Sequence, residues 1–141
     1  MIMSKFSKIV KFGYHYLEHK LEEYQLGFPE QIILMHLAKH PNINQDSIAK
    51  QYMVDKGAIA KTIVKLEQKE MIQRIQNPEN RRENLVRLSP KGEGIISHLN
   101  QNIDEWNQIL YKGLTQKDQD ELYRILGVML QNVNQALEEE N

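Results

Sequence analysis

The amino-acid sequence predicts a mostly α-helical fold with one small β-hairpin. Apolar residues recur at intervals of three or four over most of the chain, which is the spacing of amphipathic helices. Glycines and prolines are few and fall between these periodic segments, and the spacing changes to alternation only between residues 72 and 88. A chain of 141 residues has the usual size of one domain, so its parts are expected to share one core.

The composition excludes several classes of protein. With 40% apolar and 26% charged residues the chain has a globular composition, and no segment is continuously apolar enough for a membrane span. The lack of cysteine excludes disulfide scaffolds, thiolate metal sites and cysteine nucleophiles. The first residues lack the apolar stretch of a signal peptide, which predicts a cytoplasmic protein.

Three helices are expected before residue 53. The first is predicted to end near Leu26 and Gly27. The second has Pro29 in its first turn and is predicted to stop at His40, which precedes a proline. Asn44 is the predicted N-cap of a short third helix.

A tight turn at Met53, Val54 and Asp55 is expected to lead into a fourth helix, with Asp55 as its N-cap. This helix is predicted to extend from Lys56 to Glu70, with one apolar face. Its opposite face is basic and consists of Gly57, Lys61, Lys65 and Gln68.

The hairpin and two further helices complete the predicted order. Residues 72–76 and 85–88 have the spacing of strands, and the segment 77–80 between them has strong turn chemistry. Beyond the hairpin, a helix is predicted to run to Gly113, and Thr115 is the expected N-cap of the last helix.

The third and fourth helices and the hairpin together predict a winged helix-turn-helix. In that fold the second helix of the pair lies in the major groove of DNA and the hairpin is the wing. The charge supports this interpretation, because residues 50–91 carry a net charge of +5 and residues 92–141 a net charge of −6. The sequence thus divides into a DNA-binding region, 28–91, flanked by helical regions at 1–27 and 92–141.

Small and basic side chains are the candidate DNA contacts. Small residues at the start of the fourth helix would let the backbone approach the duplex, while two lysines reach phosphates or base edges. Two adjacent arginines at the hairpin tip suit a minor groove or phosphates. The alternative is that the lysines form only the solvated side of an amphipathic helix. The candidates are Gly57, Ala58, Ala60, Lys61, Lys65, Arg81 and Arg82.

Several segments, at their spacing along the chain, resemble the MarR family of winged-helix transcription regulators. The resemblance covers nearly the whole chain and implies that Gln45 and Lys56 also contact DNA. It rests on LGFPEQ at 26–31, HPNINQDSIA at 40–49, VDKGAI at 54–59, LEQKEMI at 66–72, NPENRR at 77–82 and LSPKG at 88–92.

Two features differ from the family pattern. Asn80 stands where the family has an acid, so Arg82 is expected to be held by a neutral amide that binds it less strongly. The hydroxyl residues common at the start of the recognition helix are replaced here by glycine and alanine at positions 57, 58 and 60.

Two histidine pairs have a spacing that can hold a divalent metal. His15 and His19 are one helical turn apart, and so are His36 and His40. Two histidines do not complete a site, so we expect these side chains at helix faces or packed at an interface, and we predict no metal and no cofactor.

The resemblance also implies a ligand pocket beneath a dimer interface, where family members respond to phenolic or other lipophilic anions. The residues in the corresponding helices are Tyr14, His15, Tyr16, His19 and His36. The alternative is that these side chains belong to the apolar core or to the dimer interface and bind no ligand.

The terminal helices predict a homodimer. Trp106, Ile109, Met129 and Val133 belong to apolar stripes that a second copy would cover. Two recognition helices would then lie about 34 Å apart on one side of the duplex, which implies a pseudo-palindromic operator.

The sequence therefore predicts a homodimeric, sequence-specific DNA-binding transcription regulator, and more specifically a repressor relieved by a small-molecule inducer. The alternative is a helical module that binds DNA non-specifically or contacts other proteins. An enzyme is not expected, because the sequence has no phosphate-binding loop, nucleophile elbow or complete metal set.

Overall fold

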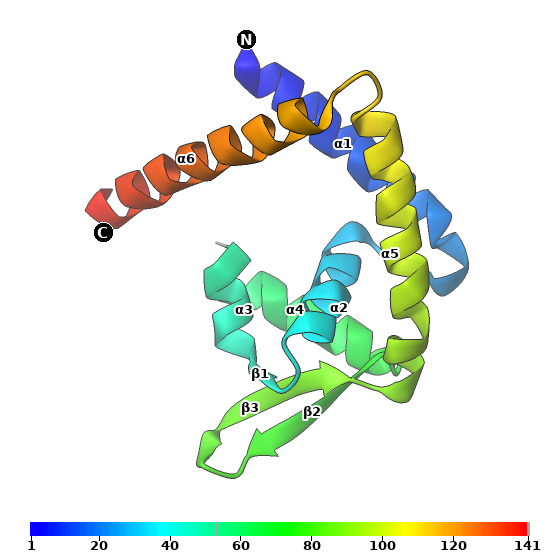
Figure 1. Ribbon diagram of the computed structural model, residues 1–141. Helices are drawn as coiled ribbons and strands as arrows, with labels where there is room; N and C mark the ends of the chain where they lie inside the picture. The colour runs from blue at the N-terminus through cyan, green and yellow to red at the C-terminus, as the bar shows by residue number, and fades with distance from the viewer. Residues whose placement is uncertain (53, 141) are drawn as a thin grey trace. The chain divides into compact units, whose positions relative to one another are not determined.

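The computed structural model describes residues 1–52 and 54–140, and within them it shows six α-helices, one short 3-10 helix and three strands (Figure 1). The predicted turn residue Met53 lies outside the described residues. Met1–Trp106 form one compact unit and the remainder of the chain forms a second. The elements are α1 (Ile2–Lys20), η1 (Glu22–Tyr24), α2 (Phe28–Lys39), β1 (Ile43–Asn44), α3 (Gln45–Tyr52), α4 (Lys56–Gln68), β2 (Ile72–Asn77), β3 (Asn80–Leu88), α5 (Pro90–Leu110) and α6 (Gln116–Glu140).

The first helix is shorter than predicted. It ends at Lys20, and the chain then passes through η1 and turns at Gln25, whose φ of 54° is left-handed. Leu21 and Leu26 are both buried. On a continuous helix, side chains five residues apart point about 140° away from each other, so the break allows both leucines to face the core.

The predicted start of α2 is confirmed. Pro29 lies in the first turn, and the Glu30 carboxylate accepts a hydrogen bond from the Gly27 backbone N–H at 3.4 Å. The Glu18 carboxylate accepts another from the Phe28 N–H at 2.9 Å. These acceptors satisfy N–H groups that a helix start leaves without partners, and they link α1 to α2.

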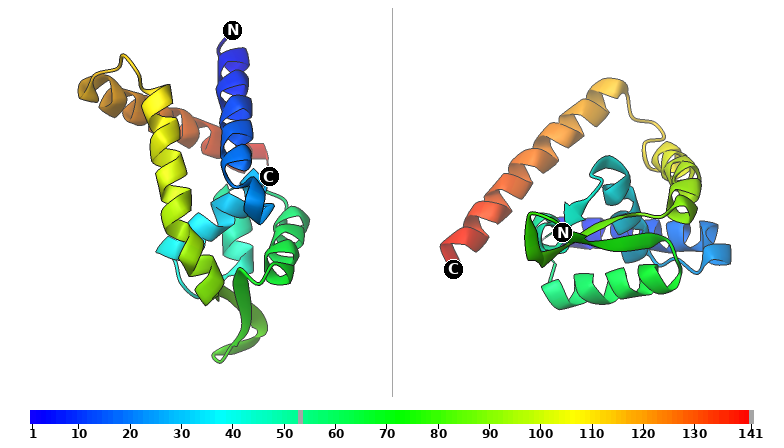
Figure 2. Two further views of the ribbon diagram at one scale, coloured as in Figure 1. Left: turned by 90° about the vertical axis from the view of Figure 1, so that its right-hand side faces the viewer. Right: turned by 90° about the horizontal axis from the view of Figure 1, so that it is seen from below.

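The predicted hairpin is confirmed, and it belongs to a larger sheet. β2 and β3 are antiparallel, with Ile72 opposite Leu88, and the strand order is β1-β3-β2. The β2–β3 hairpin projects beyond the helices at one end of its unit (Figures 1 and 2). β1 pairs Ile43 with Val86, and no sequence signal predicted this strand because two residues are too few to show a strand period.

One apolar core joins the helices of the first unit to the sheet. Each of its side chains stabilises the fold by about 1.5–3 kcal/mol through burial. Val86 of β3 is fully buried and Ile72 of β2 is buried too, so the base of the wing is part of the core. The largest fully buried side chains are Leu21, Ile33, Leu34, Leu37, Ile48, Ile63, Leu66, Met71, Val86 and Leu99.

Two further helix ends differ from the prediction. α4 ends at Gln68, because Glu70 adopts a left-handed φ of 60° and turns the chain toward β2. The Ser89 hydroxyl donates to the Glu70 carbonyl at 2.6 Å, which ties this turn to the start of α5. α5 ends at Leu110, and Gly113, with a φ of 86°, lies in the turn after it.

In the second unit the predicted cap of α6 is confirmed. The Thr115 hydroxyl accepts from the Asp118 N–H at 3.1 Å, and the Asp118 carboxylate accepts from the Thr115 N–H at 2.8 Å. None of the described residues of α6 is buried within the chain. Across the described helices, none combines the length and apolarity that crossing a bilayer requires.

Candidate nucleic-acid interface

The turn between α3 and α4 is held by hydrogen bonds close in sequence. The Asp55 carboxylate accepts from the Ala58 N–H at 3.3 Å, which confirms it as the N-cap of α4. The Val54 N–H donates to the Ala49 carbonyl at 3.1 Å, so the turn also closes the end of α3. A Cβ added to Gly57 would lie 2.8 Å from the Asp55 carboxylate, so glycine at this position leaves room for the cap.

α4 presents two chemically different faces. Ile59, Ile63 and Leu66 are buried against the core, as the apolar spacing predicted. On the other side Lys61 and Lys65 are exposed, and neither has an ion-pair partner among the described residues. This face therefore carries two unpaired positive charges on a rigid helix. Gly57, Ala58 and Gln68 are exposed too, and Ala60 is half-buried.

Lys56, the first residue of α4, is less free. Its ammonium lies 3.7 Å from the Asp46 carboxylate at the start of α3, in an exposed pair worth at most about 1 kcal/mol. Lys56 also lines a shallow cavity of about 520 Å³ between α3 and α4. Lys50 lines the same cavity, and sequence reasoning missed it because one lysine on a short helix has no distinguishing spacing.

The start of α3 faces the wing across a polar cavity of about 330 Å³. Gln45, Arg74 and Arg82 contribute to its lining. Asn44 caps α3 as predicted, because its side-chain oxygen accepts from the Asp46 N–H at 2.7 Å. Gln45 is thus held at the helix start, close to the charged side chains of the hairpin.

The tip of the wing is exposed and basic, but Asn80 does not hold Arg82 in the expected way. The Asn80 side-chain oxygen accepts from the backbone N–H of Arg82 at 3.2 Å, not from its guanidinium. The expected contact between the amide and the guanidinium is therefore replaced by a local turn. Arg81 and Arg82 are both exposed and have no ion-pair partner in the described part of the chain.

Glu83 anchors the wing, and sequence reasoning missed it. One oxygen of its carboxylate accepts from the Asn44 side chain of β1, and the other accepts from the Asn77 side chain at 2.7 Å. Arg74 adds a second connection, because its guanidinium lies 2.6 Å from the Glu67 carboxylate of α4. These contacts hold the hairpin in place against β1 and α4.

The four histidines of the two pairs have different surroundings. Among the described residues no group of three or more His, Cys, Asp or Glu side chains could hold a metal ion. His15 is exposed, and the ring of His19 lies 3.6 Å from the Glu22 carboxylate. His36 is buried, and its ring centroid lies 4.6 Å from that of His40.

His36 is instead part of a contact with α3. Its Nδ1 lies 3.0 Å from the Tyr52 hydroxyl, and its Nε2 is buried without a partner among the described residues. Burial, together with the charge of nearby His40, lowers the pKa of His36. Burial also raises the pKa of the Tyr52 hydroxyl, so both side chains are neutral near pH 7.

A third cavity, of about 370 Å³, lies among α1, α2, α3 and α4. Of the five ligand candidates on the first two helices only Tyr14 lines it, and its ring stacks on Phe28 with centroids 3.9 Å apart. Tyr16 lies instead 5.5 Å from the ring of Trp106. The lining consists of Tyr14, Phe28, Pro29, Ile32, Ile33, Tyr52, Val54, Ala58, Ile59 and Thr62.

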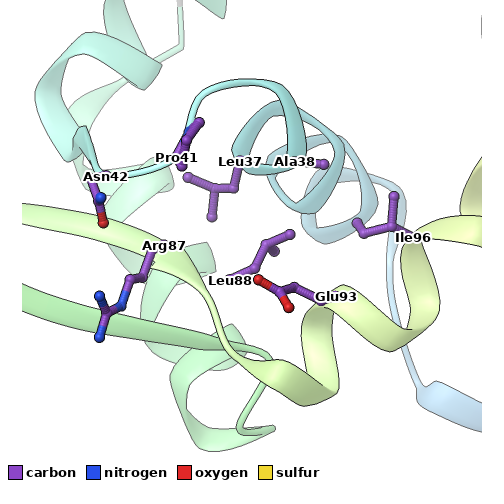
Figure 3. A pocket seen from close by; sticks show the side chains of 8 residues that line it. All are labelled: Leu37, Ala38, Pro41, Asn42, Arg87, Leu88, Glu93 and Ile96. Carbon is purple, nitrogen blue, oxygen red and sulfur yellow. The ribbon is translucent and has the colours of Figure 1, made fainter.

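A fourth cavity, of about 340 Å³, lies where the ends of α2 and β3 meet the start of α5 (Figure 3). The Glu93 and Leu88 side chains both line this cavity, whereas the Arg87 guanidinium points away from the apolar lining (Figure 3). Arg87 donates instead to the Gln73 side chain at 3.1 Å. The two charged groups therefore do not converge on this cavity.

Comparisons with known proteins agree with the architecture. The sequence model of the protein family described as the MarR family matches residues 29–84 of this chain. The HTH-type transcriptional regulator BilQ of Clostridioides difficile (strain CD3) is 29% identical over 125 residues, which cover 89% of this chain and 84% of that protein. Among solved structures, a MarR transcriptional regulator from Methanosarcina mazei Go1 is 27% identical with a TM-score of 0.88, covering 96% of this chain and 97% of that one. The S. aureus MepR–DNA complex has a TM-score of 0.86 at 21% identity, covering 94% and 98% of the two chains, and this likeness is one of fold.

Proposed function

We propose that the chain is a transcription regulator of the MarR family, whose model matches residues 29–84, and that it binds double-stranded DNA sequence-specifically as a homodimeric repressor that a small molecule relieves. Such a protein acts where the chromosome lies, so the proposal includes a cytoplasmic location. It assigns residues 28–91 to DNA binding and residues 1–27 and 92–141 to dimerisation. No catalytic activity is part of this proposal.

The observation that carries the DNA-binding proposal is the set of exposed, unpaired cations on α4 and the wing tip. Lys61 and Lys65 are on the outer face of α4, and Arg81 and Arg82 are at the end of the hairpin. A helix of this kind fits a major groove, and an arginine at a wing tip fits the adjacent minor groove. The solved complex of MepR with DNA is a precedent for a similar fold on a duplex.

Other candidate residues support contacts with the DNA backbone. Gln45, Lys50 and Lys56 are near the starts of α3 and α4, where lysines and side-chain amides can hydrogen-bond to phosphates. The small residues Gly57, Ala58 and Ala60 let the α4 backbone approach the groove. Phosphate contacts position the protein, while base contacts near Lys61 would specify the sequence.

Exposed apolar side chains support the homodimer. On α6, Tyr123, Leu130 and Val133 are at least 50% exposed, and on α1 Val10 and Phe12 are similarly uncovered. Such surfaces on long helices mark interaction sites, and a second copy of the chain is a partner that covers them symmetrically. A dimer presents two recognition helices, so the proposed operator has two half-sites about 34 Å apart.

The cavity of about 370 Å³ supports a response to a small ligand. Its lining comes from α1 and α2 and also from Ala58, Ile59 and Thr62 of α4. An occupant would therefore contact the recognition helix directly, and its binding energy could favour a position of α4 that fits the major groove less well.

Selection of bound sequences from a random DNA pool tests the DNA-binding proposal. We expect a pseudo-palindrome to be enriched and to bind at least about a thousandfold more tightly than unrelated DNA. The affinity for the selected sequence and for unrelated DNA would then be measured against salt concentration. A steep salt dependence with equal affinities for both would contradict a sequence-specific regulator and favour a non-specific DNA-binding module.

A further inference from the structure

The lining of the cavity among α1, α2, α3 and α4 is uncharged. Apolar side chains form most of it, and within the described residues no lysine, arginine, histidine or acid contributes to it. The polar side chains of the lining are the hydroxyls of Tyr14, Tyr52 and Thr62. The electrostatic character of a ligand must therefore match a neutral, mostly apolar surface.

Two of the three hydroxyls have a protein hydrogen-bond partner. The Thr62 hydroxyl donates to the Ala58 carbonyl at 3.0 Å. The Tyr52 hydroxyl lies 3.0 Å from Nδ1 of His36, and the tautomer of the ring decides which of the two donates. All three hydroxyl oxygens of the lining can accept a hydrogen bond, and none of them is charged. The polar groups of the lining therefore fit a neutral ligand that donates.

The mouth of the cavity exposes aromatic and branched side chains. Tyr14, Tyr52 and Val54 are each between 38% and 43% exposed. The stacked rings of Tyr14 and Phe28, inclined by 22°, form one wall. Flat ligands with an aromatic face complement such a wall.

We propose that this cavity binds a neutral aromatic molecule that carries a hydrogen-bond donor, and that it discriminates against aromatic anions. This inference rests on the proposed ligand response and names its ligand class. It departs from the lipophilic anions that the family resemblance implied. A volume of about 370 Å³ is at the lower end of small-molecule sites and suits a ligand of one or two rings.

Desolvation is the physical reason for the discrimination. A carboxylate that leaves water loses its hydration, and a site recovers this loss only by supplying a counter-charge and hydrogen-bond donors. Here the described lining has no counter-charge, and the Thr62 hydroxyl directs its proton to a protein acceptor. A neutral N–H or O–H group loses far less hydration free energy than a carboxylate, and in the cavity it gains a hydrogen-bond acceptor.

Three probes with the same ring system test the proposal: indole, 1-methylindole and indole-3-carboxylate. Their affinities for the protein without DNA would be measured at pH 7 by ligand-detected NMR titration. Indole is neutral and donates, 1-methylindole is neutral without a donor, and indole-3-carboxylate is an anion. We expect indole to bind at least about tenfold more tightly than the carboxylate and a few-fold more tightly than 1-methylindole.

Substitutions at Ile32 locate the binding and reverse the preference. Ile32 is half-buried in the lining, so a longer side chain can reach the cavity. Ile32→Trp fills the space and should abolish indole binding. Ile32→Arg supplies a cation whose head can remain hydrated, so indole-3-carboxylate should become the tighter ligand by about tenfold. Ile32→Gln is the matched neutral control and should keep the preference for indole. The melting temperature of each variant establishes that it is folded.

Three outcomes would overturn the proposal. One is tighter binding of indole-3-carboxylate than of indole to the unsubstituted protein. Another is indole binding that Ile32→Trp does not reduce, which places the ligand elsewhere. The third is a dimer in light scattering that binds none of the probes, which indicates that a second copy fills the cavity. Indole binding that leaves operator affinity unchanged would support the ligand class and contradict the proposed relief of repression, so the two failures are distinguishable.

Discussion

Asp55 and Asp46 are acidic residues near the starts of neighbouring helices, but we expect them to contribute differently to the free energy of unfolding. Asp55 accepts a hydrogen bond from the Ala58 N–H, whereas Asp46 forms an exposed ion pair with Lys56. We expect Asp55→Ala to lower the free energy of unfolding by about 1 kcal/mol, because an N–H of the α4 start loses its acceptor. Asp46→Ala is the control and should cost less, since exposed ion pairs contribute little. Urea unfolding measures both, and equal losses would contradict the cap assignment.

His36 makes stability depend on pH. Its folded-state pKa lies below the ordinary value of 6.5, so the unfolded chain binds the proton more readily. The free energy of unfolding should therefore be undiminished above about pH 6.5 and decrease as the pH falls below it.

Substitution isolates this effect. His36→Gln cannot titrate but can still hydrogen-bond to Tyr52, so its urea-unfolding free energy should vary less between pH 7 and pH 5 than that of the unsubstituted protein. His15→Gln, at an exposed position, is the control for replacing a histidine with glutamine. A His36→Gln profile parallel to the original would show that His36 is not responsible.

Lys61 and Arg82 are expected to differ in how they contribute to DNA affinity. If Lys61 contacts a base edge, Lys61→Ala should cost about 1–3 kcal/mol on operator DNA and relax the preference at one base pair per half-site. Arg82→Ala should weaken binding most on operators with A-tract flanks, where a narrow minor groove attracts a guanidinium. Affinities measured on A-tract and G·C flanks compare the two. Equal losses for Arg82→Ala on both flanks would reject minor-groove insertion and leave a phosphate contact.

Asn80→Asp extends this comparison. In the structure Asn80 bonds to the Arg82 backbone, and an aspartate can keep that bond while placing a negative charge near the guanidinium. If the charge restrains Arg82, the difference in affinity between the two flanks should change. An unchanged difference would mean that the guanidinium moves independently of position 80.

Two kinds of contact hold the wing. Its base is packed in the apolar core, and the part nearer its tip is held by polar side-chain contacts. Val86 is fully buried, whereas Glu83 connects the hairpin to Asn44 through a side-chain hydrogen bond. Loss of the Glu83 contacts should therefore affect the orientation of the wing more than it affects the stability of the fold.

Glu83→Ala should lower operator affinity by about 0.5–1.5 kcal/mol, because DNA binding must then order a freer wing. Its effect on the melting temperature should be smaller than that of a core substitution. Glu79→Ala is the control, because Glu79 contributes its backbone N–H to the turn and its side chain is exposed. Removing an acid near DNA by itself reduces repulsion and should not weaken binding, so an equal affinity loss for Glu79→Ala would mean that the Glu83 anchor is not responsible.

For the whole molecule, the decisive property is the proposed dimer. Leu130 and Val133 are exposed on α6, so Leu130→Glu with Val133→Glu places charges in an interface that must exclude water. We expect light scattering to show a monomer. Operator affinity should fall at least about a hundredfold although neither residue contacts DNA, because the second half-site is no longer bound by a linked copy.

Gln131→Glu is the matched control on the same helix, since it adds a charge at an exposed polar position away from the face of Leu130 and Val133. It should leave both the mass and the affinity nearly unchanged. A monomeric mass for the unsubstituted protein at micromolar concentration, together with tight operator binding, would contradict the dimer.

The sequence by itself determined the features that depend on neighbours along the chain. The caps at Asn44, Asp55 and Thr115 and the turn between β2 and β3 were predicted because each involves residues within about four positions. The buried side of α4 followed from its apolar spacing, and the resemblance to the MarR family followed from motifs in a fixed order. The assignment of DNA contacts to Gln45, Lys61 and the wing arginines stays a prediction.

Only the tertiary structure decided the features that depend on residues far apart in sequence. Glu83 meets Asn44 across 39 positions, and β1 forms because Ile43 pairs with Val86. α1 stops at Lys20 because burying both Leu21 and Leu26 requires a break that local helix propensity does not reveal. Four helices line the cavity of about 370 Å³, so its uncharged character could not be predicted from any one of them. Local spacing determines which residues share a helix face, but which faces meet depends on how the whole chain buries its apolar surface.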